Sequence, residues 1–345
     1  MLHEGETDRY RNHPGGSSAI AETANGFTPF GLLVEARAMG YDRIHPNPNT
    51  MKRRPFIRSL FTMCLTAVSG AVCLGAETLD DQPVEKGGGS QRKSNSSLPT
   101  FWIIGDSTVR VGTKGQRGWG DEMAPFFDPK KINVVNRAIG GRSSRTFLTD
   151  GRWDAILKEL RRGDVVIMQF GHNDASPINE EPPVNASTRA RGVIRDNSDK
   201  TVDVVNILTG KPETVHSYGW YLRHFVTTAK EKGATAIVCS PIPRKSWNKE
   251  EKINRSTTSW SLWAKQAAEQ SGAQYIDLNE IIARAYEKLG EKEVEPLFGD
   301  KGTHTSPAGA AFNAKAVVSG LNGLSPNPLA AALSKEGKAV PAFKP

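Results

Sequence analysis

Three residue types that together catalyse acyl transfer occur where the sequence predicts a strand end or a helix start. Ser107 closes a Gly-Asp-Ser triplet that follows the apolar run 101–104. Asp300 and His304 lie just before a predicted helix at 307–321. A serine hydroxyl is a poor nucleophile unless a base removes its proton, and a carboxylate must orient that base. We therefore predict that Ser107 is a nucleophile, His304 its base and Asp300 the acid that orients His304.

His304 is the preferred base among the histidines that follow residue 76. His224 belongs to a predicted amphipathic helix, and His216 ends a predicted hairpin. His172 lies in a Gly-His-Asn-Asp run at another strand end and is the remaining alternative. His304 has a carboxylate, Asp300, close enough along its loop to orient the imidazole, as a catalytic triad requires, and it lies just before a predicted helix.

An oxyanion formed at the attacked carbonyl also needs hydrogen-bond donors, each worth about 3 kcal/mol in such sites. The backbone N–H of Ser107 is one candidate donor. Gly141 is a second, because a residue without Cβ lets its amide approach closely, and the Asn173 side chain is a third. Both residues also have purely structural interpretations, a left-handed turn for Gly141 and a turn cap for Asn173.

Apolar runs of strand length alternate with helical patterns. The strand candidates are 101–104, 132–136, 164–170, 235–240 and 274–278, and the helix candidates are 119–126, 151–161, 217–232, 258–271, 279–289 and 307–321. Continuous apolar runs suit strands covered on both faces, as in parallel sheets. The pattern predicts an α/β fold, a three-layer αβα sandwich around a five-stranded parallel sheet. Ligand sites of such sheets lie outside the carboxyl ends of the strands.

The chain of 345 residues divides into several segments. Residues 51–76 have a basic start, an apolar stretch and an Ala-Glu junction, the layout of a secretory signal peptide rather than of a membrane anchor. We therefore expect a secreted or periplasmic protein whose translation starts at Met51, with 1–50 a mis-called, disordered extension. The remaining segments are a polar linker (77–98), the catalytic domain (99–325) with an insertion (175–216), and a loose C-terminal tail (326–345).

The insertion interrupts the alternation of strands and helices. It is rich in Pro, Asn and charged residues and contains a predicted β-hairpin around Thr209-Gly210. An insertion of this length between a strand and its helix is often a lid or a substrate wall.

Composition restricts the partners and cofactors. The formal charge of +8 suits an acidic polymer, but Lys and Arg are dispersed, and no block resembles a nucleic-acid-binding arm. We expect no nucleic-acid partner, no stable membrane insertion and a monomer. After the signal only Cys239 remains, in a buried-strand pattern, so neither an intramolecular disulfide nor a cysteine zinc site is expected. No cofactor is predicted.

The ordered polar blocks resemble those of the SGNH, or GDSL-type, hydrolases. Stretches such as "NRAIGGRSSRTF", "QFGHNDAS" and "THTSPAGA" are similar to the rhamnogalacturonan acetylesterase branch, carbohydrate esterase family 12. The likeness covers about 100–322. It implies a flavodoxin-like fold and metal-free hydrolysis of acetyl esters on pectic polysaccharide.

The resemblance also assigns site residues. It implies catalytic roles for Ser107, Asp300 and His304 and oxyanion donors at Ser107, Gly141 and Asn173. Arg142 and Trp119 lie in blocks near the predicted rim and are candidate substrate-binding residues, with ion pairing or core packing as the alternatives. The family usually spaces its acid and base as Asp-x-x-His, whereas this chain has one residue more, Asp300-Lys-Gly-Thr-His304.

Three other functions stay open at this point. The substrate could be another acetylated glycan, such as xylan. A non-catalytic glycan-binding protein could use the same fold, because a fold alone does not define an activity. A metallophosphoesterase is the third, since "GHND" resembles a metal-ligand run of that class, although a dinuclear site needs more histidines than the mature chain offers.

Overall fold

The computed structural model describes residues 95–180 and 189–345. The predicted extension 1–50, the predicted signal peptide 51–76 and most of the linker 77–98 lie outside the described residues. Within the described ranges, no helix has both the length and the apolar character needed to span a bilayer.

A five-stranded sheet forms the centre of the domain. Its strands are β1 (Thr100–Gly105), β2 (Asn133–Asn136), β3 (Val165–Gln169), β6 (Thr235–Cys239) and β7 (Gln274–Ile276), in the order β2-β1-β3-β6-β7. Every neighbouring pair is parallel. The residues of β1 and β3 are buried throughout, which explains their continuous apolar runs. The predicted parallel sheet is confirmed.

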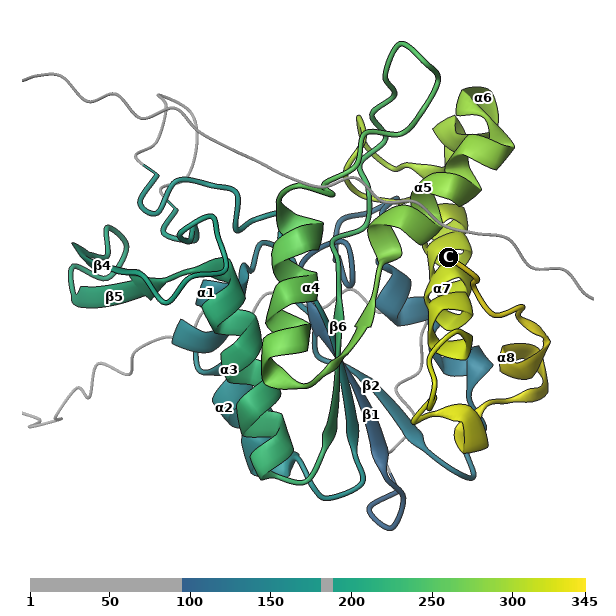
Figure 1. The fold of residues 1–345 in the computed structure, drawn as a ribbon, viewed down its shortest axis with the longest axis horizontal. Helices are drawn as coiled ribbons and strands as arrows, with labels where there is room; N and C mark the ends of the chain where they lie inside the picture. The colour runs from purple at the N-terminus through teal and green to yellow at the C-terminus, as the bar shows by residue number, and fades with distance from the viewer. Residues whose placement is uncertain (1–94, 181–188) are drawn as a thin grey trace, which may run out of the picture. The chain divides into compact units, whose positions relative to one another are not determined.

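Helices cover both faces of the sheet and create two apolar cores. One core joins α1 (Ser144–Thr149), α2 (Arg152–Glu159), α3 (Tyr218–Glu231) and α4 (Trp260–Ser271) to one face, and the other joins α5 (Leu278–Leu289) and α7 (Pro307–Asn322) to the opposite face. Successive strand residues point to opposite faces, so Ile104 enters the first core and Ile103 the second. Figure 1 shows α3 and α4 on one side of the sheet and α7 on the other. The three-layer αβα sandwich is confirmed.

Serine caps define the starts of the helices near the functional loops. Ser143 caps α1 in a capping box with Thr146, and Ser217 caps α3. Ser306 accepts a hydrogen bond from the Gly309 N–H at 3.3 Å and starts α7, with a proline at its first position, as the sequence predicts.

Two short regions differ from the predictions. The expected helix 119–126 is two 3₁₀ turns, η1 (Trp119–Glu122) and η2 (Ala124–Phe126), because Pro125 lacks the N–H that would continue η1 as an α-helix. The chain between α5 and α7 forms α6 (Glu291–Val294) and η3 (Glu295–Leu297), which the sequence patterns do not indicate.

The C-terminal segment 326–345 is not a loose tail. It forms η4 (Ala330–Ala332) and α8 (Lys335–Ala339), and Leu329 and Val340 are buried in the core on the α7 side. The Asn322 side chain donates to the carbonyls of Gly337 and Val340 at 3.0 and 2.8 Å. Apolar side chains and these hydrogen bonds attach the segment, so the catalytic domain continues past 325.

The insertion carries the predicted hairpin, β4 (Thr201–Val205) paired antiparallel with β5 (Pro212–His216). Figure 1 shows the hairpin extending to one side of the domain. Arg145 of α1, which is fully buried, anchors it through two 2.7 Å hydrogen bonds to the Glu213 carboxylate. The same guanidinium donates to the carbonyls of Ile178 and Gly192, at 2.8 and 3.0 Å. One buried arginine thus fixes three parts of the insertion to α1.

Candidate active site

Ser107, His304 and Asp300 form a continuous hydrogen-bonded chain. Ser107 Oγ lies 2.8 Å from His304 Nε2, and His304 Nδ1 lies 2.5 Å from Asp300 Oδ2. Ser107 comes from the end of β1, whereas the other two residues come from the loop before α7. The structure therefore brings together the three residues that the sequence singles out, in the geometry of a nucleophile, base and orienting acid.

The loop between Asp300 and His304 wraps around the carboxylate. Asp300 Oδ1 accepts hydrogen bonds from the backbone N–H groups of Gly302 (2.9 Å), Thr303 (2.7 Å) and His304 (3.0 Å). Burial alone would raise the pKa of Asp300, but these N–H groups and the His304 side chain hold that pKa well below its ordinary value. Asp300 is therefore ionised, with Oδ2 aimed at the imidazole.

Ser107 is held at the carboxyl edge of the sheet by a tight turn. A Cβ at Gly105 would lie 2.4 Å from the Gln169 carbonyl oxygen, so only glycine lets β1 end this close to β3. The Asp106 carboxylate accepts hydrogen bonds from the N–H and hydroxyl of Thr108, at 2.9 and 2.7 Å. Ser107 itself is largely buried, with 8% of its surface exposed.

His172 is not available as the base. Its Nδ1 lies 3.2 Å from Asp106 Oδ2, and its Nε2 lies 3.1 Å from the Ile242 carbonyl oxygen. Burial would raise the pKa of Asp106, but the charge of His172 and its hydrogen bond outweigh burial and lower it. Both ring nitrogens are thus used to brace the turn that carries Ser107.

The candidate oxyanion donors are the N–H groups of Ser107 and Gly141 and the side-chain amide of Asn173. A Cβ at Gly140 would lie 3.6 Å from Ser107 Cβ, so the loop after β2 passes close to the Ser107 side chain. Gly141 has φ +77°, a left-handed conformation that suits glycine. In the described part of the chain, the N–H groups of Ser107 and Gly141 donate no hydrogen bond. Asn173 Nδ2 donates to the Arg142 carbonyl at 3.0 Å, which places this amide beside the same loop.

Asp174 joins the start of α1 to the loop after β3. Its Oδ1 accepts from the N–H of Ser144 at 3.0 Å and from the Ser144 hydroxyl, while Oδ2 accepts from the Gly171 N–H at 3.1 Å. Burial, with a smaller contribution from the nearby Asp106 carboxylate, raises the pKa of Asp174 to about 7 despite these bonds.

This titration predicts a pH-dependent stability. The folded-state pKa of Asp174 lies above its ordinary value of 3.8, so the carboxyl stabilises the fold fully below that value and loses this contribution as the pH rises to about 7. The free energy of unfolding of the wild type should therefore fall over this range, relative to Asp174→Asn, by on the order of a few kcal/mol. Urea denaturation of both proteins at several pH values measures it. Parallel curves would contradict the assignment.

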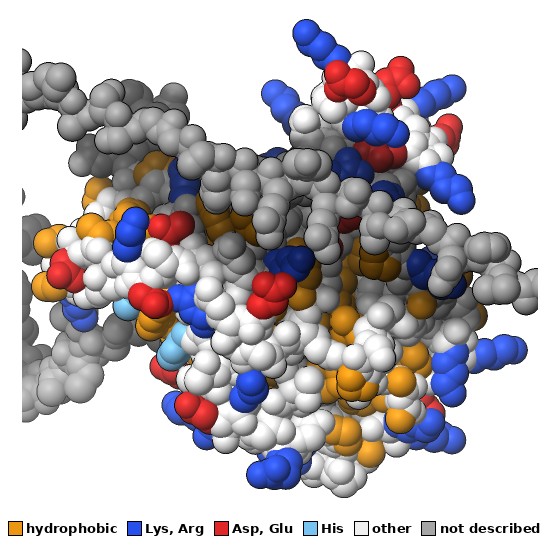
Figure 2. Space-filling model, viewed as in Figure 1, with side chains coloured by type: hydrophobic (Ala, Val, Ile, Leu, Met, Phe, Trp, Pro, Cys, Tyr) orange, Lys and Arg blue, Asp and Glu red, His pale blue; other side chains and the backbone are white. Residues whose placement is uncertain are grey.

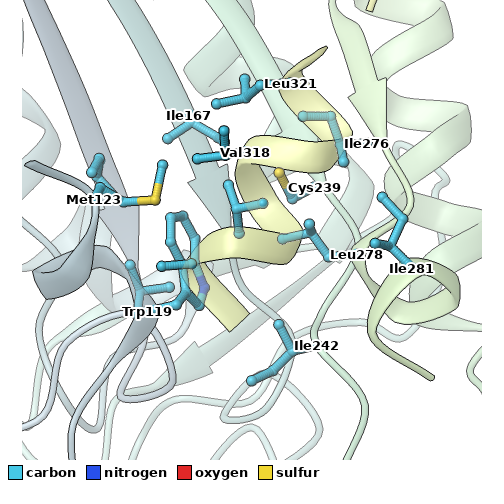
Figure 3. Close-up of a cluster of buried hydrophobic side chains, with 14 of the residues drawn as sticks. Trp119, Met123, Ile167, Cys239, Ile242, Ile276, Leu278, Ile281, Val318 and Leu321 are labelled. Carbon is cyan, nitrogen blue, oxygen red and sulfur yellow. The ribbon is translucent and has the colours of Figure 1, made fainter. Parts of the chain in front are cut away.

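The two predicted substrate-binding residues have different outcomes. Trp119 is completely buried and donates its indole N–H to Gln169 Oε1 at 3.0 Å, so it cannot touch a sugar from outside. Figure 3 shows it among core side chains that include Met123. The Trp119 prediction is wrong, because the residue fills the core under the rim. Arg142 is partly exposed, and its Nε lies 2.6 Å from Asp150 Oδ2.

Sequence reasoning missed several residues that support the site. Arg145 anchors the insertion, and Arg191 of the insertion contacts Asn173 at 2.7 Å. Neither position carries a motif that indicates its partner. Asp174 belongs to the recognised "GHND" run, but its neighbour Ser144 gives no sequence signal beyond the serine cap before it.

Comparison with known proteins places the chain in a family. Residues 103–312 match the GDSL-like Lipase/Acylhydrolase family. A rhamnogalacturonan acetylesterase of Emericella nidulans is 31% identical over 219 residues, 64% of this chain and 83% of that protein. The probable rhamnogalacturonan acetylesterase YesY of Bacillus subtilis is 31% identical over 243 residues, 68% of this chain and 98% of that protein.

A solved structure agrees with the fold. The crystal structure of the protein YxiM from Bacillus subtilis matches with a TM-score of 0.51 and 25% identity, over 65% of this chain and 56% of that longer one. The family match spans more than half of the chain and includes Ser107, Asn173 and the Asp300–His304 loop. The chain belongs to the GDSL-like Lipase/Acylhydrolase family and is an esterase of the SGNH type.

Proposed function

We propose that this esterase removes O-acetyl groups from polysaccharide, most effectively from rhamnogalacturonan, through a Ser107-His304-Asp300 triad. The observation that carries the proposal is the chain of hydrogen bonds from Ser107 Oγ to His304 Nε2 and from His304 Nδ1 to Asp300 Oδ2. The names of the two relatives that are 31% identical support rhamnogalacturonan as the polymer.

The proposed reaction has two halves. His304 Nε2 takes the Ser107 proton as Oγ bonds to the acetyl carbon, and the carbonyl electron pair moves to oxygen. When this intermediate collapses, the sugar oxygen leaves with the proton from His304, and Ser107 holds the acetyl group. Water, deprotonated by His304, then attacks the acetyl carbon of the acetyl-Ser107 ester. When this second intermediate collapses, the bond to Ser107 Oγ breaks, Oγ takes the proton from His304, and acetate is released. The N–H groups of Ser107 and Gly141 and the Asn173 amide stabilise the oxyanion in both halves.

Charge near the site supports an acidic polymer as substrate. Figure 2 shows Lys and Arg side chains at several separate places on one face of the molecule, consistent with a general attraction of formal charge +8. Closer to the triad, the exposed Arg244 donates to the hydroxyl of Thr303, the residue before His304. A uronic-acid backbone would be attracted to such groups, whereas neutral xylan would not.

Acetate release from matched polymers tests the substrate. The protein is incubated with acetylated rhamnogalacturonan, acetylated xylan and p-nitrophenyl acetate, and we expect kcat/KM on rhamnogalacturonan to exceed that on xylan at least about tenfold, or 1.4 kcal/mol. Equal or higher activity on xylan would identify another glycan as the substrate. No turnover of any ester would favour the glycan-binding alternative, and release of phosphate from p-nitrophenyl phosphate would favour the phosphoesterase.

We also propose that the protein is secreted or periplasmic, because 51–76 have the layout of a signal peptide. N-terminal sequencing of the exported protein should begin near residue 77. Peptides from 1–50 in the native protein would contradict a start at Met51.

A further inference from the structure

Arg191, in the insertion, forms a hydrogen bond with the side chain of Asn173, one of the proposed oxyanion donors. Arg191 Nη1 donates to Asn173 Oδ1 at 2.7 Å, and Arg191 Nε donates to Ser176 Oγ at 3.0 Å. Asn173 is 9% exposed, so its amide has little access to water in place of these partners. Arg191 therefore binds Oδ1 of the Asn173 amide, while Nδ2 of the same amide faces the loop after β2.

The two partners of Asn173 permit only one orientation of its amide. Nδ2 donates to the Arg142 carbonyl at 3.0 Å, while Oδ1 accepts from Arg191 at 2.7 Å. A flipped amide would place Oδ1 against a carbonyl oxygen and Nδ2 against a guanidinium, which are pairs of two acceptors and two donors. Arg191 thus keeps the amino group on the side of Gly141, the residue that precedes Arg142.

Arg191 also places a positive charge next to the amide oxygen of Asn173. The side chain is partly buried, and it lies near the carboxylates of Glu180 and Asp174. A guanidinium is always charged, and a hydrogen bond from a charged donor polarises the acceptor amide. Polarisation makes the remaining N–H of Asn173 a stronger donor to a developing oxyanion.

The surrounding contacts hold Arg191 in place. Gly192 accepts a hydrogen bond from the buried Arg145 at 3.0 Å, and the Gly192 N–H donates to the Pro177 carbonyl at 3.1 Å. A Cβ at Gly192 would lie 2.1 Å from the Ser176 carbonyl oxygen, so this part of the insertion packs closely on the loop after β3.

We propose that Arg191 is a positioning residue that orients and polarises Asn173 for oxyanion stabilisation, so that the insertion completes the active site. This inference rests on the proposed function, because it requires an oxyanion at Ser107. A positioning role predicts an effect on kcat that passes through Asn173, whereas a merely structural role would act independently of Asn173.

A double-mutant cycle separates these roles. Arg191→Gln, Asn173→Ala and the double variant are compared with wild type for kcat and KM on p-nitrophenyl acetate, a substrate too small to reach the outer surface. We expect Arg191→Gln to lower kcat about 10- to 100-fold with KM within about twofold, somewhat less than the loss of an oxyanion donor. In the Asn173→Ala background the same change should lower kcat less than about threefold, because the group it acts on is gone.

Two further variants sharpen the result. Arg191→Lys keeps the charge and should recover part of the lost kcat, while Arg189→Gln, an exposed arginine two residues away, removes the same charge without contacting Asn173 and should match wild type. An active wild type with an equally active Arg191→Gln, or an equal loss in both Asn173 backgrounds, would overturn the inference alone. A wild type with no Ser107-dependent turnover would overturn the proposed function and this inference together.

Discussion

Ser107→Ala should lower the kcat for acetate release about 10⁵- to 10⁶-fold, because the variant has no oxygen that can accept the acetyl group. The residual rate comes from binding and from the oxyanion donors, which the substitution leaves in place. Acetate released from acetylated rhamnogalacturonan and p-nitrophenol released from its acetate measure the loss. Among the described residues, Ser107 Oγ forms a hydrogen bond only with His304, so the free energy of unfolding should change by less than about 1 kcal/mol.

Inhibitors test the role of Ser107 without a substitution and complement the Ser107→Ala variant. A serine-reactive organophosphate should inactivate the wild type by bonding to Ser107, whereas EDTA should leave its activity unchanged. Loss of activity in EDTA together with an active Ser107→Ala variant would favour metal-dependent phosphoester chemistry instead. Mass spectrometry of the inhibited protein should place the added phosphorus on the peptide that contains Ser107.

The parts of the fold that the sequence predicts are those determined by continuous burial. The strands β1, β3 and β6 appear as uninterrupted apolar runs because helices cover both of their faces. Once these strands are parallel neighbours, the residues at their carboxyl ends share one edge, so Ser107 and Asn173 can be predicted to converge. The triad follows from the same topology together with the loop before α7.

The parts that the sequence did not predict depend on contacts between distant segments. Trp119 lies next to a glycine-rich turn and resembles a rim residue, but its indole N–H is satisfied by Gln169, 50 positions away, inside the core. Arg191 lies in a polar insertion where an arginine usually faces water, and its partner Asn173 is 18 positions away. The burial of Trp119 and Arg191 depends on contacts with residues far away in the sequence, which the local hydrophobic pattern does not indicate.

The spacing of Asp300 and His304 is the departure from the family pattern that the structure explains. The extra residue does not separate the pair, because three successive N–H groups fold the loop around Asp300 Oδ1. Oδ2 remains directed at His304 Nδ1 at 2.5 Å. The longer loop therefore keeps the Asp300 carboxylate in contact with the His304 imidazole, which leads to a prediction for Asp300 itself.

Asp300→Asn should lower kcat about 10³- to 10⁴-fold while the loop stays folded. The amide oxygen of Asn can still accept the N–H groups of the loop, so its amino group must replace Oδ2 opposite His304 Nδ1. A donor at that position makes Nδ1 the acceptor and leaves the proton on Nε2, which then cannot take the proton of Ser107. Lys301→Ala, an exposed neighbour in the same loop, controls for disturbance of the loop and should retain wild-type kcat.

The pH dependence of the free energy of unfolding, measured for wild type and Asp300→Asn, tests whether Asp300 is ionised. Its lowered pKa means that the carboxylate stabilises the folded loop above the ordinary value of 3.8, and that this contribution is lost only as the pH falls through the lower, folded-state value. The wild type should therefore lose stability relative to Asp300→Asn below about pH 4.

If Asp300→Asn kept kcat within about tenfold of wild type, another group would have to hold His304 in its active tautomer, and the hydrogen bond between His304 Nδ1 and Asp300 would not be the one that catalysis requires.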